Sequence, residues 1–88
     1  MNAQRRKQIE DIKARIAALL SQAEDIKSDV EAIRDEEQDY RDNMPEAFAE
    51  GEKGEKADAA IEALEQVIQD LESLTENDFD GPLDTAAE

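Results

Sequence analysis

Apolar residues recur at alternating spacings of three and four along the first half of the chain, between Ile9 and Tyr40. If Ile9 is assigned to position a of a heptad, the a positions are Ile9, Ile16, Ala23, Val30 and Glu37, and the d positions are Ile12, Leu19, Ile26, Ile33 and Tyr40. A heptad pattern sustained over more than four repeats is typical of a coiled coil or a helical bundle. The pattern therefore predicts one long helix over about residues 8–42.

A second amphipathic helix is predicted over about residues 55–74, after a loop at residues 43–54. Pro45 is incompatible with a helix interior, and Gly51 and Gly54 favour a flexible return, although residues 45–50 are long enough for one helical turn. The apolar stripe of the second helix is wider than a two-stranded seam, which indicates two neighbouring helices. Its members are Ala57, Ala60, Ile61, Leu64, Val67, Ile68, Leu71 and Leu74. The predicted fold is all-α: a long antiparallel helix–loop–helix hairpin with coiled-coil character over residues 1–74.

Residues 75–88 are acidic and contain Gly81 and Pro82, so we expect a disordered tail. Residues 76–81 imitate the start of an EF-hand loop, with oxygen-bearing side chains at positions 1, 3 and 5 and glycine at position 6. Position 12 falls on Ala87, where a calcium loop requires a glutamate. No calcium site is predicted here.

The two predicted helices differ in length, and this difference predicts a homodimer. At 1.5 Å per residue the first helix spans about 52 Å and the second only about 30 Å. The second helix is therefore too short to cover the first twenty residues, and a small chain without cysteine has few other ways to complete a core. We expect dimerisation into a helical bundle. The predicted interface comprises Ile9, Ile12, Ile16, Leu19 and Leu20 of the first helix with Ile61 and Ile68 of the second.

The chain is strongly acidic, and its charge is unevenly distributed. It has 25 acidic and 10 basic residues, a net charge of −15, whereas residues 1–20 alone have a net charge of +3. An acidic body repels nucleic acids and anionic membranes, so direct binding to either is not expected. The charge suits a protein partner with a basic surface, or it serves only to keep the protein soluble. Four of the five e positions are basic and are expected to pair with acidic residues of a facing helix. They are Lys13, Lys27, Arg34 and Arg41.

Catalytic chemistry is not expected. The chain has no histidine and no cysteine, the residues that most often serve as general base, nucleophile or zinc ligand. We therefore predict a non-enzymatic protein that needs no cofactor and no metal. The best candidate for a partner-binding site is the end of the first helix, where acidic side chains surround an aromatic ring. Its residues are Asp35, Glu36, Asp39, Tyr40 and Asp42. The alternative is a purely structural role, in which Tyr40 packs with Met44 and Phe48 to close the end of the hairpin.

Three segments resemble one group of proteins. They are IRDEEQDY at residues 33–40, DNMPE at residues 42–46 and GEKA at residues 54–57, followed by a helix rich in Ile, Leu and Glu. The whole stretch, about residues 26–74, is similar to small acidic proteins of bacteriophages and prophages. Residues 49–53 depart from the Ser/Gln-rich loop of that group. The resemblance implies a helical hairpin and a phage or prophage origin, and it implies no activity.

These observations together predict a small acidic protein-interaction module that binds and modulates a host protein. One alternative is a nucleic-acid mimic that inhibits a host nuclease or another DNA- or RNA-binding defence protein. A second alternative is a structural coiled-coil assembly element. The basic N-terminal run lacks the apolar stretch of a secretory signal, so a cytoplasmic location is expected, in the bacterial host if the protein is phage-encoded.

Overall fold

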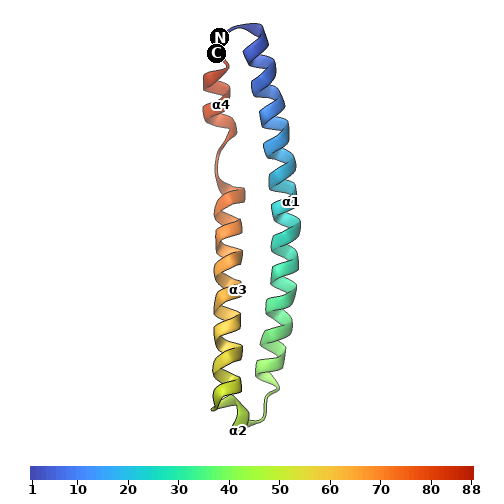
Figure 1. Ribbon diagram of the computed structural model, residues 1–88, viewed down its shortest axis with the longest axis vertical. Coiled ribbons are helices and arrows are strands. Elements are labelled where there is room, and N and C mark those ends of the chain that lie inside the picture. Colours follow the sequence, from blue (N-terminus) through green and yellow to red (C-terminus); the bar gives the residue numbers. More distant parts are fainter.

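The computed structural model describes all 88 residues, and its regular elements are helices only. Helix α1 (Ala3–Asp42) and helix α3 (Glu52–Glu76) lie side by side in opposite directions, and the short helix α2 (Glu46–Ala49) joins them at one end. Helix α4 (Asp80–Ala86) follows α3 along α1, and both chain termini lie at the end opposite α2 (Figure 1). We call the α2 end the tip and the other end the open end. The predicted all-α hairpin is confirmed.

The hairpin is long and thin, with extents of 68 × 16 × 13 Å. Its radius of gyration is 20.3 Å, compared with about 12 Å for a compact domain of this length. Only five residues are buried, namely Ala23, Gly54, Ala57, Ile61 and Ile68. None of the helices combines the length and the apolar content that crossing a membrane requires. A single chain therefore has very little core of its own.

Helix α1 begins at Ala3, five residues before the predicted start, because Asn2 caps it. The Asn2 side-chain oxygen accepts a hydrogen bond from the N–H of Arg5 at 2.8 Å, which satisfies one of the free N–H groups of the first turn. The helix ends at Asp42, as predicted, and the side-chain amide of Asn43 donates to the carbonyl of Asp39 at 2.8 Å. Pro45 then prevents the helix from continuing.

The tip is held together by a close approach between α2 and α3. The single turn expected at residues 45–50 is present as α2. Helix α3 begins at Glu52 instead of residue 55. It therefore includes Gly54, which was assigned to the loop and is buried in the structure. A Cβ atom added to Gly54 would lie 2.0 Å from the carbonyl oxygen of Ala49. Gly54 therefore provides room for the α2 backbone, and no residue of the chain has a positive φ angle.

Gly54→Ala is expected to destabilise the protein. Alanine gains about 1 kcal/mol of helix propensity over glycine, but displacing a packed backbone costs about 1–3 kcal/mol, so we expect a net loss. The matched control is Gly51→Ala, whose new Cβ atom would be 3.5 Å from its nearest neighbour. The measurement is urea unfolding followed by circular dichroism. Equal midpoints for the two variants would contradict this account of the tip.

The segment predicted to be a disordered tail is folded, so that prediction is wrong. Gly81 and Pro82 favour an irregular chain, but both lie in the first turn of α4. Proline is tolerated there because the N–H groups of a first turn have no carbonyl partner within the helix. The Asp78 side chain accepts a hydrogen bond from the N–H of Gly81 at 3.0 Å and so fixes the start of this turn.

Contacts with α1 hold α4 in place. Nζ of Lys13 binds the carboxylate of Asp84 at 2.6 Å, and Nε of Arg6 donates to the carbonyl of Ala87 at 2.9 Å. A helix of seven residues is unstable in isolation, so α4 depends on these long-range contacts. The sequence pattern alone gave no indication of them.

Candidate functional site

Helix α1 presents its d positions to solvent along its whole length. Ile12, Leu19, Ile26, Ile33 and Tyr40 are 40%, 53%, 45%, 53% and 53% exposed. The a and e positions lie toward α3 and α4 instead: Ala23 is buried, and Val30 and Lys27 are half-buried. Positions a and e are only about 40° apart around a helix, so a single neighbouring helix covers both and leaves d uncovered. Helix α1 thus has two surfaces that can pack against other helices. The hairpin covers the surface formed by positions a and e and leaves the surface formed by position d exposed.

Helix α3 contributes apolar residues to the same side of the hairpin. Arg41 and Lys27 of α1 pair with Asp58 and Glu72 of α3 at 2.9 and 3.3 Å, which defines one side as charged. The d positions of α1 and Val67 of α3, 43% exposed, lie across each helix from these pairs. We call this opposite side the apolar face. It comprises Ile12, Leu19, Ile26, Ile33, Tyr40 and Val67, bordered by the half-buried Ala60, Leu64, Leu71 and Leu74.

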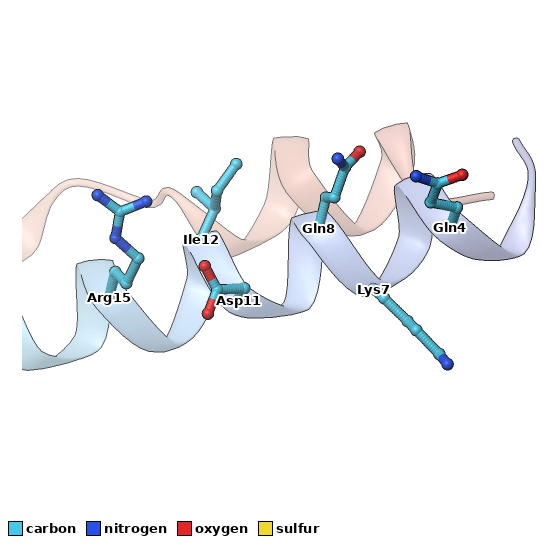
Figure 2. A pocket seen from close by; sticks show the side chains of 6 residues that line it. All are labelled: Gln4, Lys7, Gln8, Asp11, Ile12 and Arg15. Atoms are coloured by element: carbon cyan, nitrogen blue, oxygen red, sulfur yellow. The ribbon is translucent and has the colours of Figure 1, made fainter.

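Shallow hollows lie on α1 near the open end, on and beside the apolar face. One is formed by α1 alone and is lined by Gln4, Lys7, Gln8, Asp11, Ile12 and Arg15. Figure 2 shows that Gln8, Ile12 and Arg15 extend from the same side of α1, whereas Lys7 points away. A second hollow shares Ile12 and Arg15 and adds Ile16 and Leu19. Side chains of another helix could occupy these hollows, as they do in helix–helix packing.

The structure separates the residues that the sequence assigned to a dimer interface. Ile12 and Leu19 lie on the apolar face, but Ile61 and Ile68 are 7% and 6% exposed and lie inside the hairpin. The remaining three, Ile9, Ile16 and Leu20, are half-buried, and the last two line a small cavity with Phe79. The folded C-terminal segment therefore covers part of the patch that was expected to be bare. Ile26, Ile33 and Val67 of the apolar face were not among the predicted interface residues, although the d positions of the heptad already included Ile26 and Ile33.

The five residues proposed to bind a partner do not converge on a pocket. Asp35, Glu36, Asp39, Tyr40 and Asp42 are all exposed near the tip. The Asp35 carboxylate pairs with its neighbour Arg34 at 3.0 Å, and Asp42 accepts a hydrogen bond from the Gln38 side chain at 2.9 Å. Tyr40 belongs to the apolar face. The tip therefore offers an open acidic surface beside an aromatic ring, which suits contact with another macromolecule better than capture of a small molecule.

Most of the acidic charge has no internal counterpart. Five ion pairs link five of the 25 acidic side chains to lysine or arginine, which leaves twenty without such a partner within 4.0 Å. Three of the four basic e positions pair across helices as predicted, Lys13 with α4 and Lys27 and Arg41 with α3. Arg34 differs, because it pairs with Asp35 of its own helix. No group of three potential metal-ligating side chains is present.

The two cross-helix lysines predict a loss of stability in alkali. Hydrogen bonds to Asp84 and Glu72 raise the pKa of Lys13 and Lys27 above the ordinary 10.5. A raised pKa in the folded protein stabilises the fold below pH 10.5, and this contribution is lost as pH rises through the raised value. The melting temperature should therefore fall as the pH rises above 10.5. A Lys13→Gln/Lys27→Gln variant should lose less over that range than a Lys7→Gln control, as measured by circular dichroism, and equal losses would contradict the assignment.

No family model, curated protein or solved structure matches this chain. The surface features that bear on function are the apolar face, the acidic tip and the twenty carboxylates without a cationic partner.

Proposed function

We propose that the protein is a non-enzymatic interaction module that forms a homodimer through its apolar face and binds a second protein through its acidic tip. The observation that carries the proposal is the apolar face itself, which exposes five large d-position side chains along one helix. A continuous exposed stripe of this kind is characteristic of a helix surface that packs against another helix. The resemblance to phage and prophage proteins suggests that the bound protein belongs to a bacterial host.

The surface area of the chain supports a second copy as the missing neighbour. The solvent-accessible surface is 6466 Å² for 9.8 kDa, compared with about 5,200 Å² for a typical folded monomer of this mass. The excess of about 1,300 Å² exceeds the roughly 800 Å² that each partner buries in a standard interface. The core of a single chain contains only four buried apolar residues. A homodimer would add the exposed side chains of the apolar face to the buried core.

The acidic tip supports a basic protein surface as the other partner. A net charge of −15 attracts a basic partner over the distance of a Debye length, about 8–10 Å, and raises the association rate. Asp35, Asp39 and Asp42 are all exposed and do not belong to the apolar face, so they remain accessible to a partner when the apolar face is covered by a second copy.

The oligomeric state is the first test of this proposal. Light scattering behind gel filtration should give a mass of about twice 9.8 kDa at low micromolar concentration, because the apolar faces remain paired at such concentrations in stable dimers. A fully helical protein that has the mass of one chain under these conditions would overturn the homodimer.

Nucleic-acid mimicry is a second candidate, and the distribution of charge favours it. A homodimer would carry a net charge of −30 along a rod of about 68 Å, roughly one negative charge per 2 Å. Duplex DNA carries about one per 1.7 Å. A basic cleft that binds phosphates could therefore bind this rod. Mimicry predicts that the partner releases its nucleic acid as the protein is added.

A further inference from the structure

We infer that the two copies pack apolar face against apolar face with their tips at opposite ends of the dimer. In this arrangement α1 of one chain lies antiparallel against α1 of the other. The inference rests on the proposed homodimer and specifies its geometry. It follows from the length of the apolar stripe, one pair of flanking charges and the hollow at the open end.

Two symmetric arrangements bring the apolar faces together. A two-fold axis along the rod places both tips at the same end and sets α1 against α3 of the other copy. A two-fold axis across the rod places the tips at opposite ends and sets α1 against α1. Neighbouring helices are antiparallel in both cases, as in many four-helix bundles, so helix direction does not distinguish them.

The length of the stripes favours tips at opposite ends. The ion pairs Arg41–Asp58 and Lys27–Glu72 show which positions of α1 and α3 are level along the rod. On that scale the last apolar position of α3, Leu74, is level with the middle of α1, so Ile12 and Leu19 lie beyond the α3 stripe. With both tips at the same end, these two residues would face no stripe of the other copy.

The α1 stripe is complementary to itself when it is reversed. Its five d positions are evenly spaced about Ile26. If Ile26 lies on the two-fold axis, Leu19 is level with the partner's Ile33, and Ile12 is level with the partner's Tyr40. All five exposed d positions of α1 then meet an apolar counterpart, and Val67 of α3 is level with the partner's Phe79.

One pair of flanking charges favours the same arrangement. The two halves of the rod have nearly equal net charge, −7 for residues 31–60, the tip half, and −8 for the remaining residues, so net charge alone does not distinguish the two arrangements. The reversed pairing places Arg15, at the edge of the apolar face, beside the partner's Glu36, in the way that flanking charges select orientation in coiled coils.

The hollow at the open end matches the largest side chain of the stripe. Gln8, Ile12 and Arg15 line it (Figure 2), at the level where the reversed pairing places the partner's Tyr40. The tyrosine ring would enter the hollow with its hydroxyl group near the polar side chains at the edge. In the other arrangement the ring faces α3 of the other copy near Ala60, and the hollow is left empty.

Single-cysteine variants test the arrangement, because the chain has no cysteine of its own. Ile26→Cys should form a covalent dimer under mild oxidation, because two copies of a residue on the axis lie within reach of a disulfide. Ile12→Cys is the matched control on the same stripe, since its two copies would be about 42 Å apart. We expect Ile26→Cys to cross-link at least ten-fold faster, and a mixture of Ile12→Cys with Tyr40→Cys to cross-link where neither does alone.

The outcomes separate this inference from the proposed homodimer. If light scattering shows a dimer but Ile26→Cys does not cross-link, the opposite-end arrangement is wrong and the homodimer stands. Cross-linking in a mixture of Ile33→Cys with Val67→Cys would then identify the same-end arrangement. A protein that is monomeric by light scattering overturns both.

Discussion

Replacing Leu19 and Ile33 together with aspartate is expected to convert the homodimer into a monomer. Each side chain is about half exposed in the single chain, so burying the rest gains about 1 kcal/mol. A dimer contains four such positions, and their loss corresponds to roughly a thousand-fold weaker association. The reversed pairing also places the new carboxylates opposite one another, which weakens association further. The measurements are mass by light scattering and helicity by circular dichroism.

The matched control for this variant is Ala14→Asp with Ser28→Asp. Both residues are exposed on α1 at heptad position f, away from the apolar face, and their replacement adds the same charge to the same helix. This control should remain dimeric. If both double variants dissociate, the cause is the added charge, and the apolar face is not the interface.

Reversing the charge of the acidic tip is expected to abolish partner binding. Asp35→Lys, Asp39→Lys and Asp42→Lys together replace three exposed carboxylates beside Tyr40 and should weaken binding of a basic partner by about 100-fold or more. Because none of the three is buried, the helical spectrum should be unchanged. Binding of the partner captured from host lysate is measured by titration at low and high salt.

A second triple variant distinguishes a local site from the field of the whole rod. Glu62→Lys, Glu65→Lys and Asp70→Lys change the net charge equally, but they lie on α3, and all three residues are exposed. A site at the tip predicts a much smaller effect from this variant. Equal weakening by both triple variants would place recognition along the rod, as mimicry requires.

Competition with nucleic acid then decides between the two candidate functions. Under mimicry the partner loses its nucleic acid as this protein is added, and the affinity falls steeply with salt. A partner that binds this protein and nucleic acid at the same time would exclude mimicry and leave the interaction module.

The helices were predictable because their signals are local. The heptad pattern and Pro45 were sufficient to place the end of α1 at Asp42, and residues 45–50 formed the expected turn. The start of α1 was missed because Asn2 was not recognised as a cap. Gly54 was assigned to the loop because a sequence does not show whether a glycine bends the chain or makes room for another backbone.

The apolar face was not predictable in the same way, because it depends on the direction from which α3 approaches α1. The pattern shows that positions a and d of α1 are mostly apolar and that position e is mostly basic. It does not show whether α3 packs against positions a and d or against positions a and e. The aliphatic stems of Lys27 and Arg41 can cover the contact while their charged ends reach α3. Basic e positions therefore lie toward the hairpin seam, and the apolar d positions were left outside.

The fold of residues 75–88 was missed for a related reason. A seven-residue acidic segment has no periodicity from which a helix can be read, and its stability comes from Lys13 and Arg6, more than 70 residues earlier in the chain. Only the folded hairpin brings these groups together.

The meeting of the two termini at the open end has a consequence for the order of the helices along the chain. The amino group of Met1 lies 3.5 Å from the carbonyl oxygen of Glu88, so a short linker could join them, and new ends could be opened at Gly51. In this circular permutant α4 would come directly before α1, and the Lys13–Asp84 pair, now separated by 71 residues, would become local. The entropy lost on closing the chain between Lys13 and Asp84 would then be much smaller, so it would oppose formation of this ion pair less. Local unfolding would then begin at the former tip, where the new ends lie.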